Sequence, residues 1–174
     1  NIPAVLNKLD RNYFANRLEL LNRFWLQKKV AQLDPSDIML ARFEDLSIPT
    51  NYLERSILLQ TVEKIHNLLR HPLAAAQDFQ DLMSSLQKNE DRLAAETLQQ
   101  FYTYLRNFCV LSIDAGNDEL IPVMHNIQRD NLRRGYFYQT GKISPSAYLS
   151  INRIAIMANE VEWALQFTES HKDK

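Results

Sequence analysis

The feature that most constrains this chain is its shortage of glycine, since the 174 residues contain only three. Gly116, Gly135 and Gly141 each come where an apolar helical pattern has just ended or is about to begin again. Glycine serves turns, bulges and helix ends, where the backbone needs freedom that other residues lack. So few glycines, placed in this way, argue against sheets and predict an all-α fold.

Helix start signals divide the chain into segments. Asp34 before Pro35, and Ser144 before Pro145, place a capping side chain directly before a proline at the first helical position. The stretch NYLE, which begins at Asn51, has the spacing of a capping box. The eight helices that these signals and the apolar periodicity predict lie near residues 5–32, 35–45, 51–69, 73–88, 92–115, 118–134, 145–158 and 160–171.

Two of the predicted helices, 92–115 and 145–158, are apolar around most of their circumference. A helix with so broad an apolar surface has to be covered on more than one side. The helix that follows each of them is narrower and more charged. An inner helix enclosed by neighbours, followed by an outer helix that faces water, is typical of stacked helical hairpins.

A weak internal repeat, with an offset of 43 residues, supports this arrangement. The matching pairs are Phe108–Ile151, Leu111–Ile154, Gly116–Asn159, Ala115–Ala158, Glu119–Glu162 and Leu120–Trp163. Glycine and asparagine are the residues that tolerate a left-handed backbone at a helix end. The stretch DAGNDEL at 114–120 is therefore predicted to be a joint, in which Gly116 ends one helix and Asn117 or Asp118 caps the next. A calcium loop would need alternating acidic residues and a closing glutamate, which do not follow.

The segments YLRNFCVLSIDAGNDELIPVMHNIQRDNLRRG and ISPSAYLSINRIAIMANEVEWALQFTESHK resemble tandem tetratricopeptide-like helical hairpins. More narrowly, the runs NFC, GN, RG and EWALQF resemble a group of uncharacterised bacterial helical-repeat proteins. The likeness is clearest in the repeat units 92–134 and 145–172, whose period exceeds the usual period of about 34 residues. It implies a right-handed stack of antiparallel helix pairs, an α-α superhelix of about eight helices. The narrower group has no assigned activity to carry over.

Composition sets further bounds on compartment and partners. Twenty basic against 21 acidic residues give a net charge of −1, so no overall field attracts nucleic acid or an anionic membrane. No apolar run is long enough to span a membrane. The single cysteine, Cys109, is expected to be a buried thiol, and the absence of a disulfide partner fits a cytoplasmic protein. We expect one helical-repeat domain over 1–174, a fragment of a longer protein that begins here at Asn1.

Few residues have the spacing of a catalytic or metal site. Glu63 and His66 match half of a di-iron motif, but a second copy and two further glutamates are missing. Asp78 and Asp81 share a helix face without the denser acidic run of a magnesium-diphosphate site. No glycine-rich phosphate loop is present. We expect surface charge at these positions, no metal, no cofactor and no catalytic residue.

Two sets of residues remain as candidate binding sites. Three side chains of helix 92–115 are expected to point outward and contact a protein or peptide: Tyr104, Asn107 and Arg106. The stretch QRDNLRRGYFYQTGK is the one locally basic region, and it offers for RNA the residues Arg129, Arg133, Arg134, Tyr136 and Lys142. The same cations also suit a structural role at a helix C-terminus.

The expected function is accordingly a non-catalytic scaffold for protein–protein or peptide interaction. The alternative is a helical-repeat RNA-binding module that uses the basic end of helix 118–134.

Overall fold

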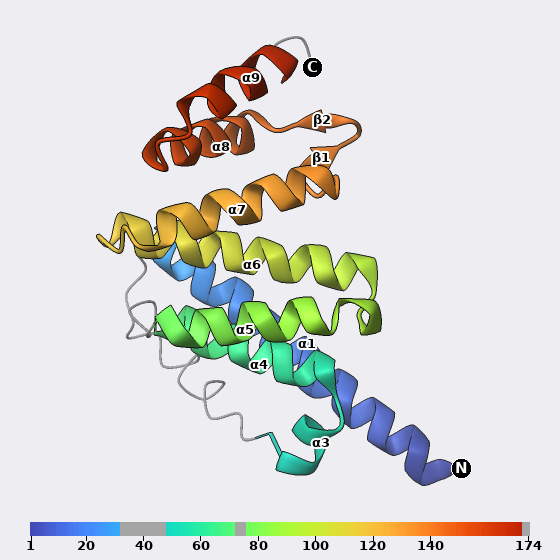
Figure 1. The fold of residues 1–174 in the computed structure, drawn as a ribbon. Helices are drawn as coiled ribbons and strands as arrows, with labels where there is room; N and C mark the ends of the chain where they lie inside the picture. Colours follow the sequence, from blue (N-terminus) through green and yellow to red (C-terminus); the bar gives the residue numbers. More distant parts are fainter. Residues whose placement is uncertain (32–47, 72–75, 172–174) are drawn as a thin grey trace. The chain divides into compact units, whose positions relative to one another are not determined.

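The structure, a computed structural model, describes residues 1–31, 48–71 and 76–171 (Figure 1). Of these residues, 81% are helical, which confirms the prediction of an all-α fold. The chain divides into two compact units, Asn1–Tyr104 and Leu105–Lys174, and the boundary falls inside one helix, α6. The predicted helix 35–45, with its cap at Asp34, lies outside the described residues.

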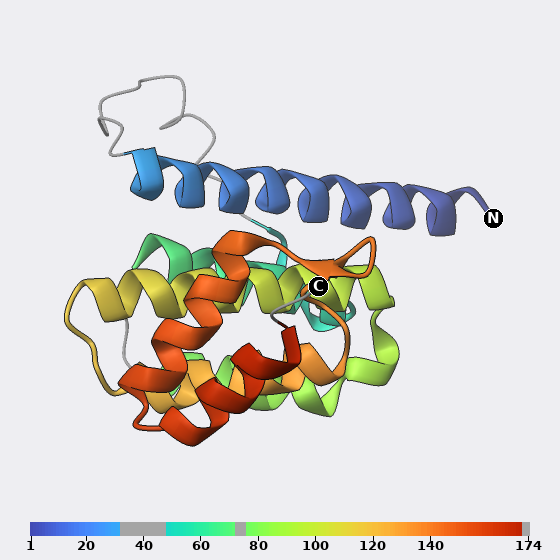
Figure 2. The same cartoon turned by 90° about the horizontal axis from the view of Figure 1, so that it is seen from above.

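The N-terminal unit is built around a long first helix. Its elements are α1 (Ile2–Ala31), α3 (Thr50–Glu54), α4 (Ile57–Arg70), α5 (Ala76–Lys88), a 3-10 turn at Glu90–Arg92 and the first half of α6 (Ala95–Asp114). Within this unit α4 packs against α1, α3 and α5. Figure 2 shows α1 as one unbroken helix. The core contains the fully buried Leu59, Ile65, Leu69, Phe79 and Leu86.

The predicted helix 51–69 is two helices, because the backbone extends at Ser56. Ser56 is the N-cap of α4, and its hydroxyl accepts a hydrogen bond from the Leu59 N–H at 3.3 Å. The predicted capping box at Asn51 was wrong, since α3 begins at Thr50 and Pro49 occupies its N-cap position without a side-chain bond. Serine competes for backbone hydrogen bonds and so favours a cap over a helix interior.

The C-terminal unit contains the rest of α6 and four further elements in sequence. These are α7 (Leu120–Arg133), a hairpin of β1 (Tyr138–Gln139) and β2 (Lys142–Ile143), α8 (Pro145–Met157) and α9 (Val161–His171). Within this unit α7 packs on α8, and α8 on α9 (Figure 1). Ser144 caps α8 and Pro145 follows at its first turn, as predicted. The loop predicted over 136–144 contains the hairpin, whose turn residues Thr140 and Gly141 both have positive φ.

Three helix ends share one left-handed termination. At the end of α6, Gly116 has a φ of 97°, and the Asn117 N–H donates to the Ser112 carbonyl at 2.9 Å. The ends of α7 and α8 repeat this pattern, with Gly135 and Asn159 in the left-handed position. This is the Schellman motif, in which two backbone bonds satisfy the last helical carbonyls. The joint predicted at Gly116, and its equivalence to Asn159, are confirmed.

The start of α7 differs from the prediction. Neither Asn117 nor Asp118 caps it with a side chain, because Glu119 occupies the N-cap position and makes no side-chain cap bond. The carbonyls of Asn117 and Asp118 instead accept hydrogen bonds from the Leu120 and Ile121 N–H groups, at 3.3 and 3.1 Å. Backbone turns therefore lead directly from the Schellman motif into α7.

The left-handed joint predicts how Gly116 responds to substitution. Gly116→Val is expected to lower the free energy of unfolding by about 1–2 kcal/mol, because a β-branched residue is strained at positive φ. Gly116→Asn is expected to cost less, since asparagine already occupies the equivalent position at Asn159. Chemical denaturation measures both values. Equal stability of the valine and asparagine variants would contradict this account of the joint.

Candidate functional site

Tyr104 is a core residue, contrary to the prediction that it points outward. Its side chain is only 4% exposed. The hydroxyl donates to the Glu19 backbone carbonyl at 3.5 Å and accepts from the Gln100 side chain at 3.2 Å. Burial raises the pKa of this phenol. The prediction was wrong because α6 is apolar on so many sides that a tyrosine, too, is enclosed, with its hydroxyl held by polar partners.

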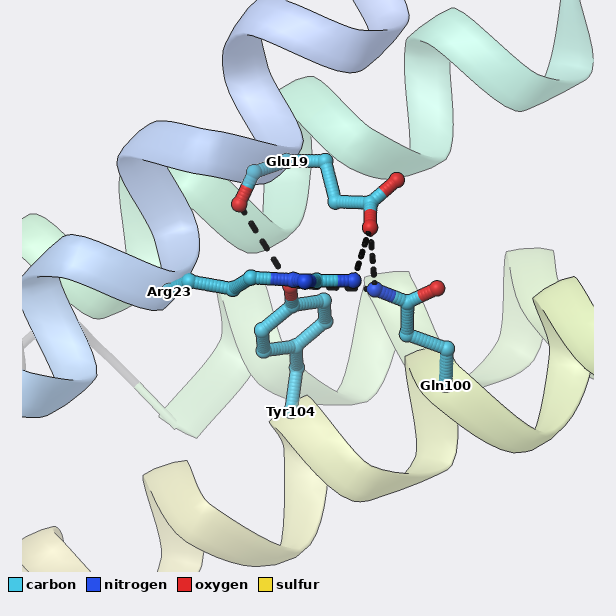
Figure 3. A network of polar contacts seen from close by, with 4 residues as sticks. All are labelled: Glu19, Arg23, Gln100 and Tyr104. Atoms are coloured by element: carbon cyan, nitrogen blue, oxygen red, sulfur yellow. Dashed lines mark hydrogen bonds and ion pairs between the residues drawn. The ribbon is translucent and has the colours of Figure 1, made fainter.

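The hydroxyl of Tyr104 belongs to a polar network inside the N-terminal unit (Figure 3). The Glu19 carboxylate accepts from the Arg23 guanidinium at 2.6 Å and from the Gln100 amide at 2.7 Å. Glu19 and Arg23 come from α1, whereas Gln100 and Tyr104 come from α6. The network therefore joins two helices that are distant in sequence, and its role is structural.

The other two residues of the predicted protein-binding set differ in exposure. The Arg106 guanidinium lies 4.4 Å from the centre of the Phe137 ring, a cation–π contact within the C-terminal unit. Burial lowers the pKa of Arg106 to about 10. Asn107 is exposed. Of the three residues, only Asn107 thus presents an exposed side chain.

The predicted RNA-binding stretch has less unpaired positive charge than its sequence indicates. Asp130 accepts from Arg133 at 3.2 Å and from Arg134 at 2.6 Å, so two arginines share one carboxylate. Arg129 and Lys142 are exposed and Tyr136 is half-buried. The Tyr136 N–H donates to the Asn131 carbonyl in the helix cap. The pairing of Arg133 and Arg134 with Asp130, at the end of α7, fits the structural role of cations at a helix C-terminus.

The half di-iron motif in α4 is part of the core instead. His66 is buried, contrary to the expected solvated face, and its Nδ1 lies 2.9 Å from the Asn22 side-chain oxygen. Burial, with smaller effects from Arg70 and His71, lowers the pKa of His66 to about 4. Burial also raises the pKa of Glu63. Among the described residues, no group of three histidine, cysteine or acidic side chains is placed to hold a metal.

The remaining chemical candidates lie where the sequence indicated. Asp78 and Asp81 are exposed on α5, and Asp81 accepts from Gln77 at 2.7 Å. Cys109 is fully buried, and this burial raises the pKa of its thiol to about 12. A protonated, enclosed thiol is unreactive.

A shallow hollow of about 240 Å³ lies beside α1 and α3 in the N-terminal unit. Polar side chains line most of it: Asn7, Arg11, Asn51, Tyr52 and Arg55, together with Ala4. Arg11 already donates from Nε to the Asn7 carbonyl at 3.2 Å. Ligand pockets are usually apolar with a few polar groups. This hollow is therefore a weaker candidate than the apolar surface described next.

Sequence reasoning missed an exposed apolar surface on α8 and α9. Leu149 and Leu165 are 67% and 62% exposed, and Ile156, Met157 and Val161 are also exposed. At about 100° per residue, Leu149, Ile156 and Met157 share one side of α8, and Val161 and Leu165 share one side of α9. These five residues are called the α8–α9 surface below. The breadth of the apolar pattern in 145–158 was the available signal, but it was taken to mean that α8 is covered on more than one side.

Another side of each of these two helices is well packed. Ile151, Ile154 and Ala155 of α8 are buried, as are Ala164 and Phe167 of α9. Ile151 and Phe108, which the sequence repeat pairs, are both buried. The described residues therefore cover one side of α8 and leave its other apolar side exposed.

A row of aromatic rings lies along α9. Trp163 stacks on Phe167 with ring centres 5.4 Å apart, and Phe167 contacts His171 at 4.4 Å. The His125 ring of α7 meets Trp163 edge-on at 4.8 Å. Such ring pairs add stability beyond the area they bury. They pack α9 against α7 and along its own length.

Acidic side chains flank the α8–α9 surface. Glu162 and Glu169 are exposed on α9, next to the apolar side that carries Val161 and Leu165. The one arginine on the exposed side of α8, Arg153, is paired with Asp114 at 2.7 Å. The exposed apolar residues of α9 thus have acidic neighbours, whereas the exposed side of α8 also carries the Arg153–Asp114 ion pair.

Comparisons with family models, curated proteins and solved structures find no match to this chain. No helix within the described ranges is both long enough and apolar enough to cross a membrane.

The burial of Tyr104 predicts a stability effect. Tyr104→Ala is expected to lower the free energy of unfolding by about 3–5 kcal/mol, because it leaves a cavity and unpairs the Glu19–Gln100 network. Tyr104→Phe should cost about 1 kcal/mol, the value of the lost hydroxyl bonds. Asn107→Ala, at an exposed position of the same helix, is the control and should stay within about 0.5 kcal/mol. A stable alanine variant would contradict the core assignment.

The lowered pKa of His66 predicts a pH dependence. The unfolded chain gains a proton here near pH 6.5, whereas the folded chain gains one only near pH 4. Stability contributed by neutral His66 is therefore lost as the pH falls from about 6.5 to 4. Chemical denaturation at pH 7 and at pH 5 measures this loss. Between the two values the free energy of unfolding should fall by about 1–2 kcal/mol more for the native sequence than for His66→Gln.

The matched control for this measurement is the exposed neighbour His71. His71→Gln should keep a pH dependence close to that of the native sequence. An identical pH dependence in the native sequence and in His66→Gln would rule out the proposed role of His66.

Proposed function

We propose that this chain is a non-catalytic protein-interaction module, a right-handed stack of antiparallel helix pairs, and that a partner docks on the α8–α9 surface. The observation that carries the proposal is the exposed apolar side of α8, with Leu149 67% exposed on a helix whose opposite side is fully packed. Large apolar side chains gathered on one surface mark interaction sites.

Two observations support the stacked arrangement. The repeat of 43 residues brings Phe108 and Ile151 to equivalent buried positions. It also brings Gly116 and Asn159 to equivalent left-handed helix ends with the same pair of backbone bonds. In stacked hairpins each pair covers the apolar side of the one before it. Among the described residues no further pair covers the exposed sides of α8 and α9, which leaves them open to a helix from another protein.

The chemistry of the surface selects the partner. Its centre consists of leucine, isoleucine, methionine and valine, which suit the apolar side of an amphipathic helix. Its edge carries Glu162 and Glu169, so a partner helix with lysine or arginine beside its apolar side is favoured. The proposed partner is therefore a protein segment that forms a basic amphipathic helix.

RNA binding, the alternative, draws less support. The arginines Arg133 and Arg134 share the carboxylate of Asp130, which lowers the positive charge available for phosphate. RNA binding and protein binding can be distinguished by substitution, because the basic stretch and the α8–α9 surface consist of different residues.

The proposal is tested with designed peptides and neutral substitutions. A basic amphipathic helical peptide is expected to bind in fluorescence anisotropy more tightly than the same apolar sequence with acidic flanks. Leu149→Asn with Leu165→Asn should weaken binding about tenfold or more, because buried apolar contact is lost. Gln166→Asn, at the exposed neighbour of Leu165, is the matched control and should bind like the native sequence.

Three outcomes count against the proposal. Equal affinity for basic and acidic peptides would contradict the preference for a basic helix. Unchanged binding in the double leucine variant would show that the peptide does not bind at the α8–α9 surface. Salt-sensitive binding of a single-stranded RNA, abolished by changing Arg129, Arg133 and Arg134 to glutamine, would favour the RNA-binding alternative instead.

A further inference from the structure

Helix α1 is apolar on two opposite sides, and the described residues cover only one of them. On one side Ala15, Leu18 and Leu21 are buried, with the fully buried Asn22 beside them. These residues face the core in which α1 packs along α4. The other side carries large apolar residues that are each more than half exposed: Ile2, Leu6, Leu9, Tyr13 and Leu20. Since a residue turns the helix by about 100°, the two sets lie nearly opposite each other.

The exposed residues have the spacing of a coiled coil. Positions 2, 6, 9, 13, 16 and 20 are separated by four and three residues in alternation, over almost three heptads. Asn16 is the one polar residue in this series, and it is exposed as well. The series Ile2, Leu6, Leu9, Tyr13, Asn16 and Leu20 is called the α1 seam below. By this spacing Leu6, Tyr13 and Leu20 are a positions, and Ile2, Leu9 and Asn16 are d positions. A single polar residue among such core positions favours the register that pairs it with its own counterpart, because any other register buries it without a partner.

From this geometry we infer that the α1 seam binds the α1 seam of a second copy of this chain, in a parallel, in-register, two-stranded coiled coil. Parallel pairing sets Asn16 opposite Asn16 of the second copy, where the two amides hydrogen-bond each other. An antiparallel pair in the register that matches all six positions would set Asn16 against Leu6. The amide would then be buried without a partner, at a cost of about 1–3 kcal/mol.

The exposed area is sufficient for a weak, specific dimer. Five large side chains, each more than half exposed, together with Val5 beside them, amount to on the order of 600 Å² per copy. Two copies would bury about 1,200 Å², which is the lower limit for a specific interface. A coiled coil of this length is marginal on its own, so the dimer should depend on concentration.

Helix α3, in the described part of the N-terminal unit, contacts a side of α1 other than the α1 seam. Asp10 bonds the Tyr52 hydroxyl at 2.7 Å, and Phe14 contacts the Tyr52 ring at 5.7 Å, so α3 lies away from the seam. Arg17 donates to the Tyr13 hydroxyl at 2.7 Å and thereby holds this seam residue in place. The inference is independent of the α8–α9 surface, which lies in the other unit.

Sedimentation equilibrium of the full chain tests the inference directly. The native sequence is expected to shift from monomer to dimer as its concentration rises through the micromolar range. Leu6→Asn with Leu9→Asn should raise the dissociation constant about tenfold or more, because both side chains lie in the middle of the seam. Asn7→Ala with Asn12→Ala, at neighbouring positions outside the seam, is the matched control and should leave it unchanged.

The two leucine positions are exposed in the monomer, so the variant should fold, and circular dichroism checks that it does. A native sequence that stays monomeric up to millimolar concentration would overturn the inference. Dimerisation that survives the leucine substitutions unchanged would also overturn it, since another surface would then be responsible.

Strand direction is tested by a disulfide. Leu20→Cys is expected to form a covalent dimer under mild oxidation, because parallel pairing brings the two introduced thiols together. In the antiparallel register they would lie roughly 25 Å apart and stay free. The native Cys109 is buried, with its pKa raised to about 12, and does not interfere. A dimer in solution whose introduced thiols do not crosslink would overturn the parallel assignment.

Discussion

The structure depends on one requirement, that a helix with apolar residues on two sides has both sides covered. Helix α6 comes nearest to meeting it within the chain, since its buried residues extend from Tyr104 through Phe108 and Leu105 to Ile113, over about half of its circumference. Helices α1 and α8 have the same kind of sequence, yet the described residues cover each of them on one side only. The hydrophobic effect makes the exposed side costly in water, so both helices favour association.

The buried polar groups follow from the same crowding. Residues that would be surface residues on a half-covered helix become part of the core and need partners there. The Tyr104 hydroxyl hydrogen-bonds the Gln100 side chain and the Glu19 carbonyl, and the His66 ring hydrogen-bonds the Asn22 side chain. The contacts of Tyr104 with Glu19 and of His66 with Asn22 connect helices that are far apart in sequence, and they explain why two residues with the chemistry of a binding or metal site are structural.

Much of the fold could be predicted from local signals. The cap at Ser144, the left-handed position of Gly116 and its equivalence to Asn159 depend on backbone chemistry within a few residues, which the sequence displays directly. The break at Ser56 was missed because serine also occurs inside helices, and the NYLE stretch that begins at Asn51 offered a competing start. Periodicity alone does not distinguish the two choices.

The candidate site was harder to predict, because exposure depends on what the rest of the chain covers. The apolar pattern of α8 is as broad as that of α6, and no local signal shows that Leu149 is exposed while Cys109 is buried. The same limit applies to Tyr104, which was predicted to point outward. Arg133 and Arg134 were visible as a basic cluster, but their shared contact with Asp130 required side-chain geometry.

The central claim is that the exposed side of α8 and α9 binds a basic amphipathic helix. Methyl NMR of the labelled protein, titrated with such a peptide, tests it most directly because it locates the contact. The account predicts shifts in the methyl groups of Leu149, Ile156 and Leu165, with little change at buried Ile65 and Leu69 of the other unit. Shifts that avoid α8 and α9, or no shifts at a saturating peptide concentration, would contradict it.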